Sequence, residues 1–317
     1  MKRLLLWLAA IALPGAAPAQ TFPEQPVHIV VPFGPGGLAD ITMRALGERL
    51  APLLGKPVVI ENQPGAGGVT AALAVKKAKP DGHTLLVVVN GTAIAKSLFK
   101  ALPYDPQADF APVSLVAYFD LVVAVNPARY ATLKDLVAAA KAAPGKLNFA
   151  TINPGSTQNL SAQLFKSVAG IDVTVVPFRT TPDAAASVVS GEADAVFESY
   201  ATLKGLVAGG RLKPLATSAS KSYGYLPGVP TVEEAGVKGY VVTGWNALAA
   251  PAGTPPERIA ILNRDVNAVV AQPDFKARLL EGGSLAYGGT PDELKKQLAD
   301  DIVKWKDVIE KAGIPKQ

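Results

Sequence analysis

The architecture of this chain follows from one stretch near its N-terminus, Val27-His28-Ile29-Val30-Val31-Pro32-Phe33-Gly34-Pro35-Gly36-Gly37-Leu38-Ala39-Asp40. A β-branched apolar run ends in a loop of proline and glycine, and a helical pattern begins directly after the loop. This order predicts a strand, a tight turn and a helix start. The first backbone N–H groups of a helix have no helical partner and lie at the positive end of its dipole. The junction is therefore suited to a small anion.

Outward from this stretch, short β-rich apolar runs alternate with helical patterns. The alternation predicts an α/β fold with mainly parallel sheets and helices on both faces. The predicted strands are residues 27–33, 58–61, 85–89, 113–117, 121–125, 147–150, 173–176, 195–198, 212–217 and 240–243.

The domain organisation is predicted from length and from two unusual apolar segments. A chain of 317 residues is long enough to divide into two lobes. Segments 118–125 and 240–249 lack the usual turn between elements, and we expect them to cross between the lobes. Lobe 1 is then residues 20–120 plus 244–317, and lobe 2 is residues 121–243.

The first 19 residues read as a signal peptide. Lys2 and Arg3 precede an apolar run that is too short to span a bilayer, and Ala17-Pro18-Ala19 supplies a cleavage site before Gln20. We therefore expect export to the periplasm, with a membrane anchor as the alternative.

Composition excludes several classes of protein. The chain has no cysteine, which rules out disulfides, thiolate metal sites, a cysteine nucleophile and a lipid-anchored N-terminal cysteine. Its net charge of +5 falls by two when the signal peptide is removed, and the basic residues are scattered. No nucleic-acid-binding patch is therefore expected.

Three predicted strand-to-helix loops share a composition of proline, glycine and small polar residues. They are residues 32–37, 62–68 and 153–158, the last of them in lobe 2. Glycine lets the backbone approach a ligand closely, and Ser156 or Thr157 can cap a helix beside an oxyanion. Each loop alone could be an ordinary turn, but three from both lobes favour a shared anion site.

Nucleotide binding is the weaker alternative for the first loop. A dinucleotide fingerprint needs a third glycine where Ala39 stands, and the phosphate-loop motif is absent.

Polar side chains at other strand ends are candidate ligand contacts. Asp40 either complements the dipole of its helix or accepts a hydrogen bond from a ligand. Arg179 either clamps a carboxylate or is a surface charge, and Glu198 is its acidic counterpart. Asn90 and Thr92 supply neutral donors and acceptors.

Catalytic and metal-binding patterns are missing from the sequence. The two histidines, His28 and His83, have no metal-ligand spacing, and no serine is coupled to a histidine. We expect no enzyme activity, no metal and no cofactor.

Motifs spread along the chain carry a family resemblance. They are Phe22-Pro23-x-x-Pro26-Val27, Val31-Pro32-Phe33-x-Pro35-Gly36-Gly37-x-x-Asp40-x-x-x-Arg44, Val59-Ile60-Glu61-Asn62-x-Pro64-Gly65-Ala66-Gly67-Gly68, Leu102-Pro103-Tyr104-Asp105-Pro106-x-x-Asp109-Phe110-x-Pro112-Val113, Leu226-Pro227-x-Val229-Pro230-Thr231-x-x-Glu234-Ala235-Gly236 and Ala250-Pro251-Ala252-Gly253-Thr254-Pro255. Over essentially all of the mature chain, the sequence resembles the solute receptors of tripartite tricarboxylate transporters, the Bug group of periplasmic binding proteins.

The resemblance implies a two-lobed, venus-flytrap receptor of the type II periplasmic-binding-protein class. It implies that a small organic carboxylate is held between the lobes by loops 35–37 and 155–157, with Asp40 at the ligand's other polar group. It also implies delivery to the membrane subunits of a tripartite tricarboxylate-type transporter by a receptor that we expect to be a monomer. The alternative is a receptor that signals to a membrane sensor.

The sequence departs from the family pattern at three places. Phe178-Arg179-Thr180 stands where Tyr-Lys-Gly is common, Glu198 stands where aspartate is common, and Asn159 ends a run that often ends in histidine. The resemblance therefore does not imply which acid is bound. The predicted ligand-binding residues are Phe33, Pro35, Gly36, Gly37, Asp40, Gly67, Asn90, Thr92, Gly155, Ser156, Thr157, Arg179, Thr180 and Glu198.

Overall fold

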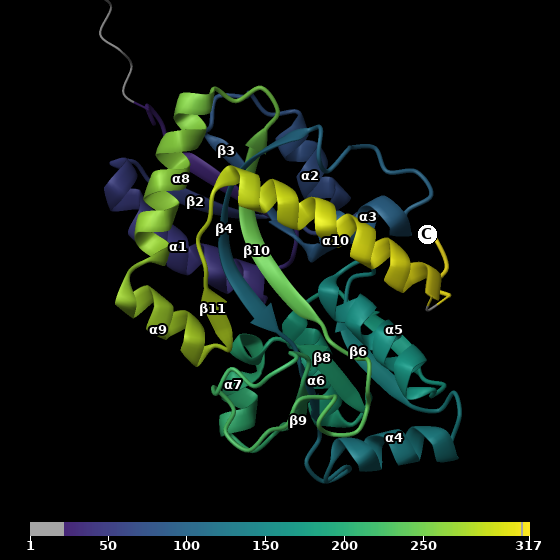
Figure 1. The fold of residues 1–317 in the computed structure, drawn as a ribbon. Helices are drawn as coiled ribbons and strands as arrows, with labels where there is room; N and C mark the ends of the chain where they lie inside the picture. The colour runs from purple at the N-terminus through teal and green to yellow at the C-terminus, as the bar shows by residue number, and fades with distance from the viewer. Residues whose placement is uncertain (1–21, 312) are drawn as a thin grey trace, which may run out of the picture.

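A computed structural model describes residues 22–311 and 313–317, which form two α/β lobes (Figure 1). Lobe 1 is built on a six-stranded sheet and lobe 2 on a five-stranded sheet. The predicted signal peptide lies outside the described residues. Among the described helices, none combines the length and hydrophobicity that crossing a bilayer requires.

The sheet of lobe 1 has the strand order β11-β4-β10-β3-β1-β2. β1 pairs in parallel with β2 and β3, whereas β10 runs antiparallel between β3 and β4, and β11 is antiparallel to β4. The bounds are β1 (Val27–Val31), β2 (Val58–Asn62), β3 (Thr84–Val89), β4 (Phe110–Asp120), β10 (Thr243–Pro251) and β11 (Ser284–Ala286).

Successive side chains of a strand point to opposite faces of the sheet, and the central strands carry apolar side chains on both faces. Helices therefore cover both faces. Ile29 and Leu85 belong to a core with α1 (Leu38–Leu54), α8 (Pro256–Val270) and α9 (Pro273–Glu281). Val30 and Leu86 belong to a core on the other face, and the elements there are the 3₁₀ turn η1 (Ala66–Gly68), α2 (Val69–Lys76), α3 (Asn90–Leu98) and α10 (Pro291–Lys311).

Lobe 2 repeats this three-layer arrangement with the strand order β7-β6-β8-β5-β9. Phe149 packs with one pair of helices and its neighbour Ala150 with the other pair. The strands are β5 (Val122–Val125), β6 (Asn148–Ile152), β7 (Thr174–Phe178), β8 (Ala195–Glu198) and β9 (Lys213–Thr217). The first pair of helices is α4 (Leu133–Ala142) and α5 (Thr157–Ala169), and the second is α6 (Thr181–Ser190) and α7 (Tyr200–Ala208).

The α/β class and the helices on both faces are confirmed, but the sheets are mixed rather than mainly parallel. Among the described strands, four pairs are parallel and five are antiparallel. The antiparallel pairs all involve β4, β5 or β10, which adjoin the passages between the lobes. The predicted strand at 240–243 is wrong, since β10 begins at Thr243 and continues to Pro251, and β11 was not predicted.

The chain passes between the lobes at two adjacent points. β4 leads through Leu121 into β5, and the return passage enters β10 at Thr243, which pairs with Asp120. The buried hydroxyl of Ser218 accepts a hydrogen bond from the Leu121 N–H at 2.8 Å and donates to the Val242 carbonyl at 2.6 Å. One side chain therefore links the two passages.

The Asp120 carboxyl group is buried beside these two passages. The Tyr225 hydroxyl donates to Oδ1, but Oδ2 has no hydrogen-bond partner in the described part of the chain. Burial raises the pKa of Asp120 to about 6.

This raised pKa predicts a defined pH dependence of stability. The folded protein binds a proton more tightly than the unfolded chain, so stability falls as pH rises from about 4 to about 6. Asp120→Asn removes the ionisation, and we expect it to raise the free energy of unfolding by about 3 kcal/mol at pH 7.5. Urea unfolding at pH 4 and 7.5 tests this. A gain of equal size at both pH values would contradict the role of ionisation.

Candidate ligand site between the lobes

A narrow cavity lies between the two lobes. Lobe 1 contributes Phe33, Gly37, Leu38, Ala39, Val89, Phe119 and Asn246, and lobe 2 contributes Ile152, Thr157, Gln158 and Thr181. None of these described lining residues is ionisable. Polarity in the cavity therefore comes from backbone groups, two hydroxyl groups and two side-chain amides.

Helix starts from both lobes adjoin this cavity. The first residues of α1, α5 and α6 line it, and so does Val89, which precedes α3. α1 has no side-chain cap, whereas the caps of α5 and α6 accept only from the third helical N–H, on Asn159 and Asp183. The earlier N–H groups of these helices have no helical partner. With four positive dipole ends nearby, the cavity is electrostatically suited to an anion.

The lobes touch each other on one side of the cavity through the first predicted loop. A Cβ atom added to Gly34 would lie 3.4 Å from the Thr180 Cγ2 atom, and one added to Gly37 would lie 3.6 Å from the Thr181 Oγ1 atom. Loop 34–37 of lobe 1 therefore packs directly against the start of α6 in lobe 2.

A second contact between the lobes involves loop 153–155. A Cβ atom on Gly91 would lie 3.0 Å from the Gly155 carbonyl oxygen, and one on Gly67 would lie 3.0 Å from the Pro154 carbonyl oxygen. Glycine allows this backbone-to-backbone approach. All three predicted loops therefore take part in contacts between the lobes, and the structure is a closed form.

Asp40 is buried, and its carboxylate is occupied within lobe 1. Oδ2 accepts from the Gly36 N–H at 3.0 Å, while Oδ1 accepts from Arg44 and Asn62, each at 3.0 Å. Burial acts to raise the pKa of Asp40, but the hydrogen bonds outweigh it and the pKa lies below its ordinary value. The side chain thus stabilises the first loop, and it is not among the cavity-lining residues.

Glu198 lies fully buried behind the cavity wall. Its Oε1 accepts from Gln158 at 2.8 Å and from the Ser199 N–H at 2.7 Å, and Oε2 accepts from the Thr181 hydroxyl at 2.9 Å. Burial raises the pKa of Glu198 above its ordinary value, against the effect of these hydrogen bonds. Glu198 orients two residues that line the cavity and does not line it itself.

Asn90 and Thr92 are also engaged in structural contacts. The Asn90 amide donates to Asp301 at 2.8 Å and accepts from the Trp245 N–H at 2.8 Å. The Thr92 hydroxyl accepts from the Val89 N–H at 3.2 Å and so caps α3.

The structure places the other predicted residues as follows. Phe33, Gly37 and Thr157 line the cavity. Ser156 and Thr180 cap α5 and α6 beside it, and Gly67 and Gly155 form the contact between the lobes. Pro35, Gly36 and Arg179 are exposed.

Sequence reasoning did not single out eight lining residues: Leu38, Ala39, Val89, Phe119, Ile152, Gln158, Thr181 and Asn246. Leu38, Ala39 and Gln158 stand in the first turns of helices at two of the predicted loops, so their backbone N–H groups were a detectable signal. Asn246 is a polar residue inside the apolar run 244–249, which was a second signal.

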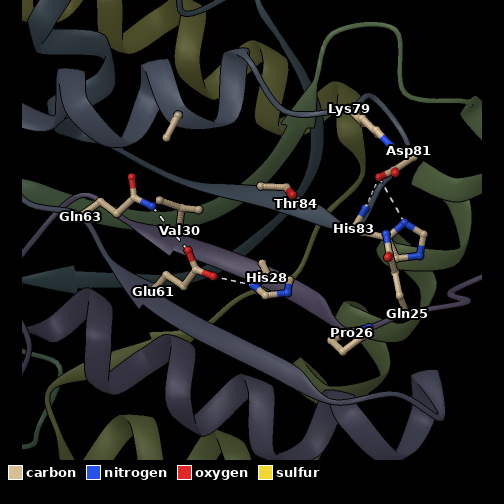
Figure 2. Close-up of a pocket in the computed structure, with 11 residues that line it drawn as sticks. Gln25, Pro26, His28, Val30, Glu61, Gln63, Lys79, Asp81, His83 and Thr84 are labelled. Atoms are coloured by element: carbon tan, nitrogen blue, oxygen red, sulfur yellow. Dashed lines mark hydrogen bonds and ion pairs between the residues drawn. The ribbon is translucent and has the colours of Figure 1, made fainter.

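A separate hollow lies on one face of lobe 1 and contains both histidines (Figure 2). His28 Nδ1 lies 2.5 Å from Glu61 Oε1, and His83 Nδ1 lies 3.1 Å from Asp81 Oδ1. Among the described residues, no cluster of three or more histidine, aspartate or glutamate side chains could hold a metal ion. Because this hollow belongs to one lobe, closure of the lobes cannot enclose a ligand in it.

Two lobes closed on an anion-suited cavity define a solute receptor with the type II periplasmic-binding-protein fold. Residues 42–314 match the model of the "Tripartite tricarboxylate transporter family receptor", TctC. The chain belongs to this family of periplasmic solute-binding receptors. It is similar to the protein BugT of Bordetella pertussis, with 33% identity over 99% of this chain and 98% of that protein.

Solved structures show the same architecture. A Rhodopseudomonas palustris protein, Rpa4515 with adipate, has a TM-score of 0.90 and 31% identity, over 93% of this chain and 100% of that chain. MatC from the same species, with bound malate, has a TM-score of 0.86 and 34% identity, over 91% of this chain and 100% of that chain. Two similar proteins thus bind dicarboxylic acids.

Proposed function

We propose that this protein captures a small organic carboxylate between its lobes in the periplasm and delivers it to the membrane subunits of a tripartite tricarboxylate-type transporter. The observation that carries the proposal is the group of helix N-termini, from both lobes, around the closed cavity. The dicarboxylates held by the similar proteins support the same ligand class.

We propose further that the protein is a monomer and that its signal peptide is cleaved before Gln20. Its lobes are residues 20–120 plus 244–317 and residues 121–243. The distribution of strands between the two sheets supports these boundaries, because the chain leaves the first sheet after Asp120 and returns to it at Thr243.

Closure is the step that converts weak contacts into capture. In an open cleft the backbone N–H groups of α1, α5 and α6 are hydrated, and water competes with the carboxylate. When loop 34–37 meets the start of α6, water is excluded and each hydrogen bond to the anion becomes electrostatically stronger. The ligand then stabilises the closed form by the difference between its affinities for the two forms.

Thermal unfolding against a panel of dicarboxylates, keto acids, hydroxy acids, amino acids and aromatic acids tests the ligand class. A carboxylate at 100 times its dissociation constant should stabilise the protein by about 2.7 kcal/mol. Methyl esters of the same acids are the matched controls, and they should give no shift because they lack the negative charge. Stabilisation by the esters, or by none of the acids, would contradict the proposal.

Delivery is tested in cells that carry the membrane subunits. Uptake of the bound acid should require both the receptor and the membrane subunits. Uptake that is unchanged when the receptor is deleted would contradict delivery and leave carboxylate capture intact.

A further inference from the structure

We propose that Asp120 takes up a proton when the lobes close, so that capture of the ligand is coupled to pH. The proposal rests on the proposed function, because it requires a ligand that closes the lobes. Asp120 is not among the residues that line the ligand cavity, so the coupling acts through closure and not through contact with the ligand.

The Asp120 carboxyl group lies at the boundary between the lobes. Asp120 is the last residue of β4 in lobe 1, and the hydroxyl group that donates to its Oδ1 belongs to Tyr225 of lobe 2. Tyr225 also packs on Tyr200, the first residue of α7, with 5.3 Å between the ring centroids. The hydrogen bond to the carboxyl group therefore crosses from one lobe to the other.

Two glycines of lobe 1 pack against the same part of lobe 2. A Cβ atom added to Gly283 would lie 2.8 Å from the Tyr225 ring and 3.0 Å from the Tyr200 Cβ atom. One added to Gly282 would lie 3.1 Å from the Ala201 Cβ atom. In Figure 1 this junction is where α7 lies beneath α9 and β11. Closure therefore packs lobe 1 directly against the tyrosines that cover the carboxyl group.

The closed form gives an ionised Asp120 little compensation. The residue is 1% exposed, and its Oδ2 atom has no hydrogen-bond partner within the described residues. The adjacent strands present neutral side chains, Thr243 in β10 and Ser284 in β11, and the Ser284 hydroxyl is itself buried without a partner in the described part of the chain. A buried charge without a partner is strongly destabilising, which favours the protonated carboxyl group.

The titratable groups around Asp120 do not supply a positive charge. Tyr223 and Tyr225 face it from one loop of lobe 2, and burial raises the pKa of both, so both stay neutral. Lys204 and Glu281 line a hollow beside these tyrosines and pair with each other across the lobes at 3.3 Å. No lysine or arginine of the described residues pairs with Asp120, and burial raises its pKa to about 6 in the closed form.

Opening the lobes moves Tyr200 and Tyr225 away from lobe 1 and admits water to Asp120. A hydrated aspartate has a pKa of about 4. Between pH 4 and pH 6 the open form is therefore ionised, whereas the closed form holds a proton. For a ligand of constant charge, binding should then take up about 0.8 proton at pH 5 and almost none at pH 7.5, and affinity should be about tenfold higher at pH 5 than at pH 7.5.

Carbon-13 NMR of the Asp120 carboxyl carbon tests the proposal on the wild-type protein, with Asp120→Asn identifying the resonance by its loss. The midpoint of its titration should lie near pH 4 in the ligand-free protein and near pH 6 in protein saturated with the tightest acid of the panel. An equal midpoint in both would overturn this inference and leave carboxylate capture intact. If no carboxylate binds, the proposed function and this inference both fail.

Calorimetry in two buffers of different ionisation enthalpy measures the proton uptake itself at pH 5. Uptake should be about 0.8 proton lower in Asp120→Asn than in the wild type, because the two proteins share the ligand's own titration. Asp265→Asn is the matched control, since Asp265 is also buried but lies in α8 of lobe 1 and pairs with Arg264 at 2.7 Å. This control should take up as many protons as the wild type.

Equal proton uptake in the wild type and a folded Asp120→Asn variant would overturn the role of Asp120. Circular dichroism establishes that each variant is folded. If Asp120→Asn does not fold, the difference between the free and the ligand-bound titration of the wild type still decides the proposal.

Discussion

Gly91→Val should weaken binding of a carboxylate by about a hundredfold, which corresponds to about 2.7 kcal/mol. A Cβ atom at this position would lie 3.0 Å from the Gly155 carbonyl oxygen of the opposite lobe. The two additional methyl groups of valine increase the overlap, and overpacking of this kind costs about 1–3 kcal/mol. The clash with Gly155 exists only in the closed form, and the contact within lobe 1, 3.4 Å from Val89 Cγ2, is an ordinary van der Waals distance, so the variant should fold normally. Calorimetry with the tightest acid of the panel gives the change in dissociation constant.

Gly205→Val is the matched control for this substitution. Gly205 lies in α7, is exposed, and has nothing within 4 Å of an added Cβ atom. Both glycines occupy helices without a positive φ, so both substitutions impose a similar change on the backbone. The control should bind like the wild type. Equal affinity in the two variants would mean that contact between Gly91 and Gly155 is not needed for capture.

Asn90→Ala should lower the free energy of unfolding by about 3 kcal/mol without a comparable loss of ligand affinity. The Asn90 amide joins α10 to β10, because it donates to Asp301 and accepts from the Trp245 N–H. Asp301 also accepts from the indole N–H of Trp245 at 2.7 Å. Removing Asn90 leaves a buried N–H group unpaired and deprives a buried carboxylate of one donor. Urea unfolding and calorimetry on the same preparation measure the two effects.

A double-mutant cycle separates the structural role of Asn90 from a role in binding. Asp301→Asn, alone and combined with Asn90→Ala, should reveal a coupling energy of about 1–2 kcal/mol in stability. If Asn90 contacted the ligand instead, Asn90→Ala would reduce affinity sharply while leaving stability nearly unchanged. That result would support Asn90 as a ligand contact, as the sequence predicted.

The local elements of this protein were largely predictable from its sequence. The run 27–33 followed by proline and glycine predicted β1 and the loop before α1, and the same reasoning located loops 62–68 and 153–158. These predictions succeeded because backbone conformation at proline and glycine depends mainly on the residue itself and its neighbours. The mixed pairing of the sheets was not predictable in this way, since an apolar run looks the same in a parallel and an antiparallel strand.

The roles of individual polar side chains depended on partners that are distant in the sequence. Asp40 and Glu198 both stand at junctions where a ligand contact was a reasonable prediction, yet hydrogen bonds from their surroundings occupy both carboxylates. Asn90 likewise meets Asp301, which is 211 residues away. Asn246, inside an apolar strand, lines the cavity, and its buried Nδ2 has no hydrogen-bond partner within the described residues.

The stretch from Val27 to Asp40 thus specified a strand, a glycine-rich turn and a helix start suited to an anion, because these depend on local backbone preferences. Tertiary structure decided that this helix start would meet those of α5 and α6 across two lobes. It also decided which polar residues line the cavity, because a buried polar group bonds to whichever partner the packed chain brings within reach.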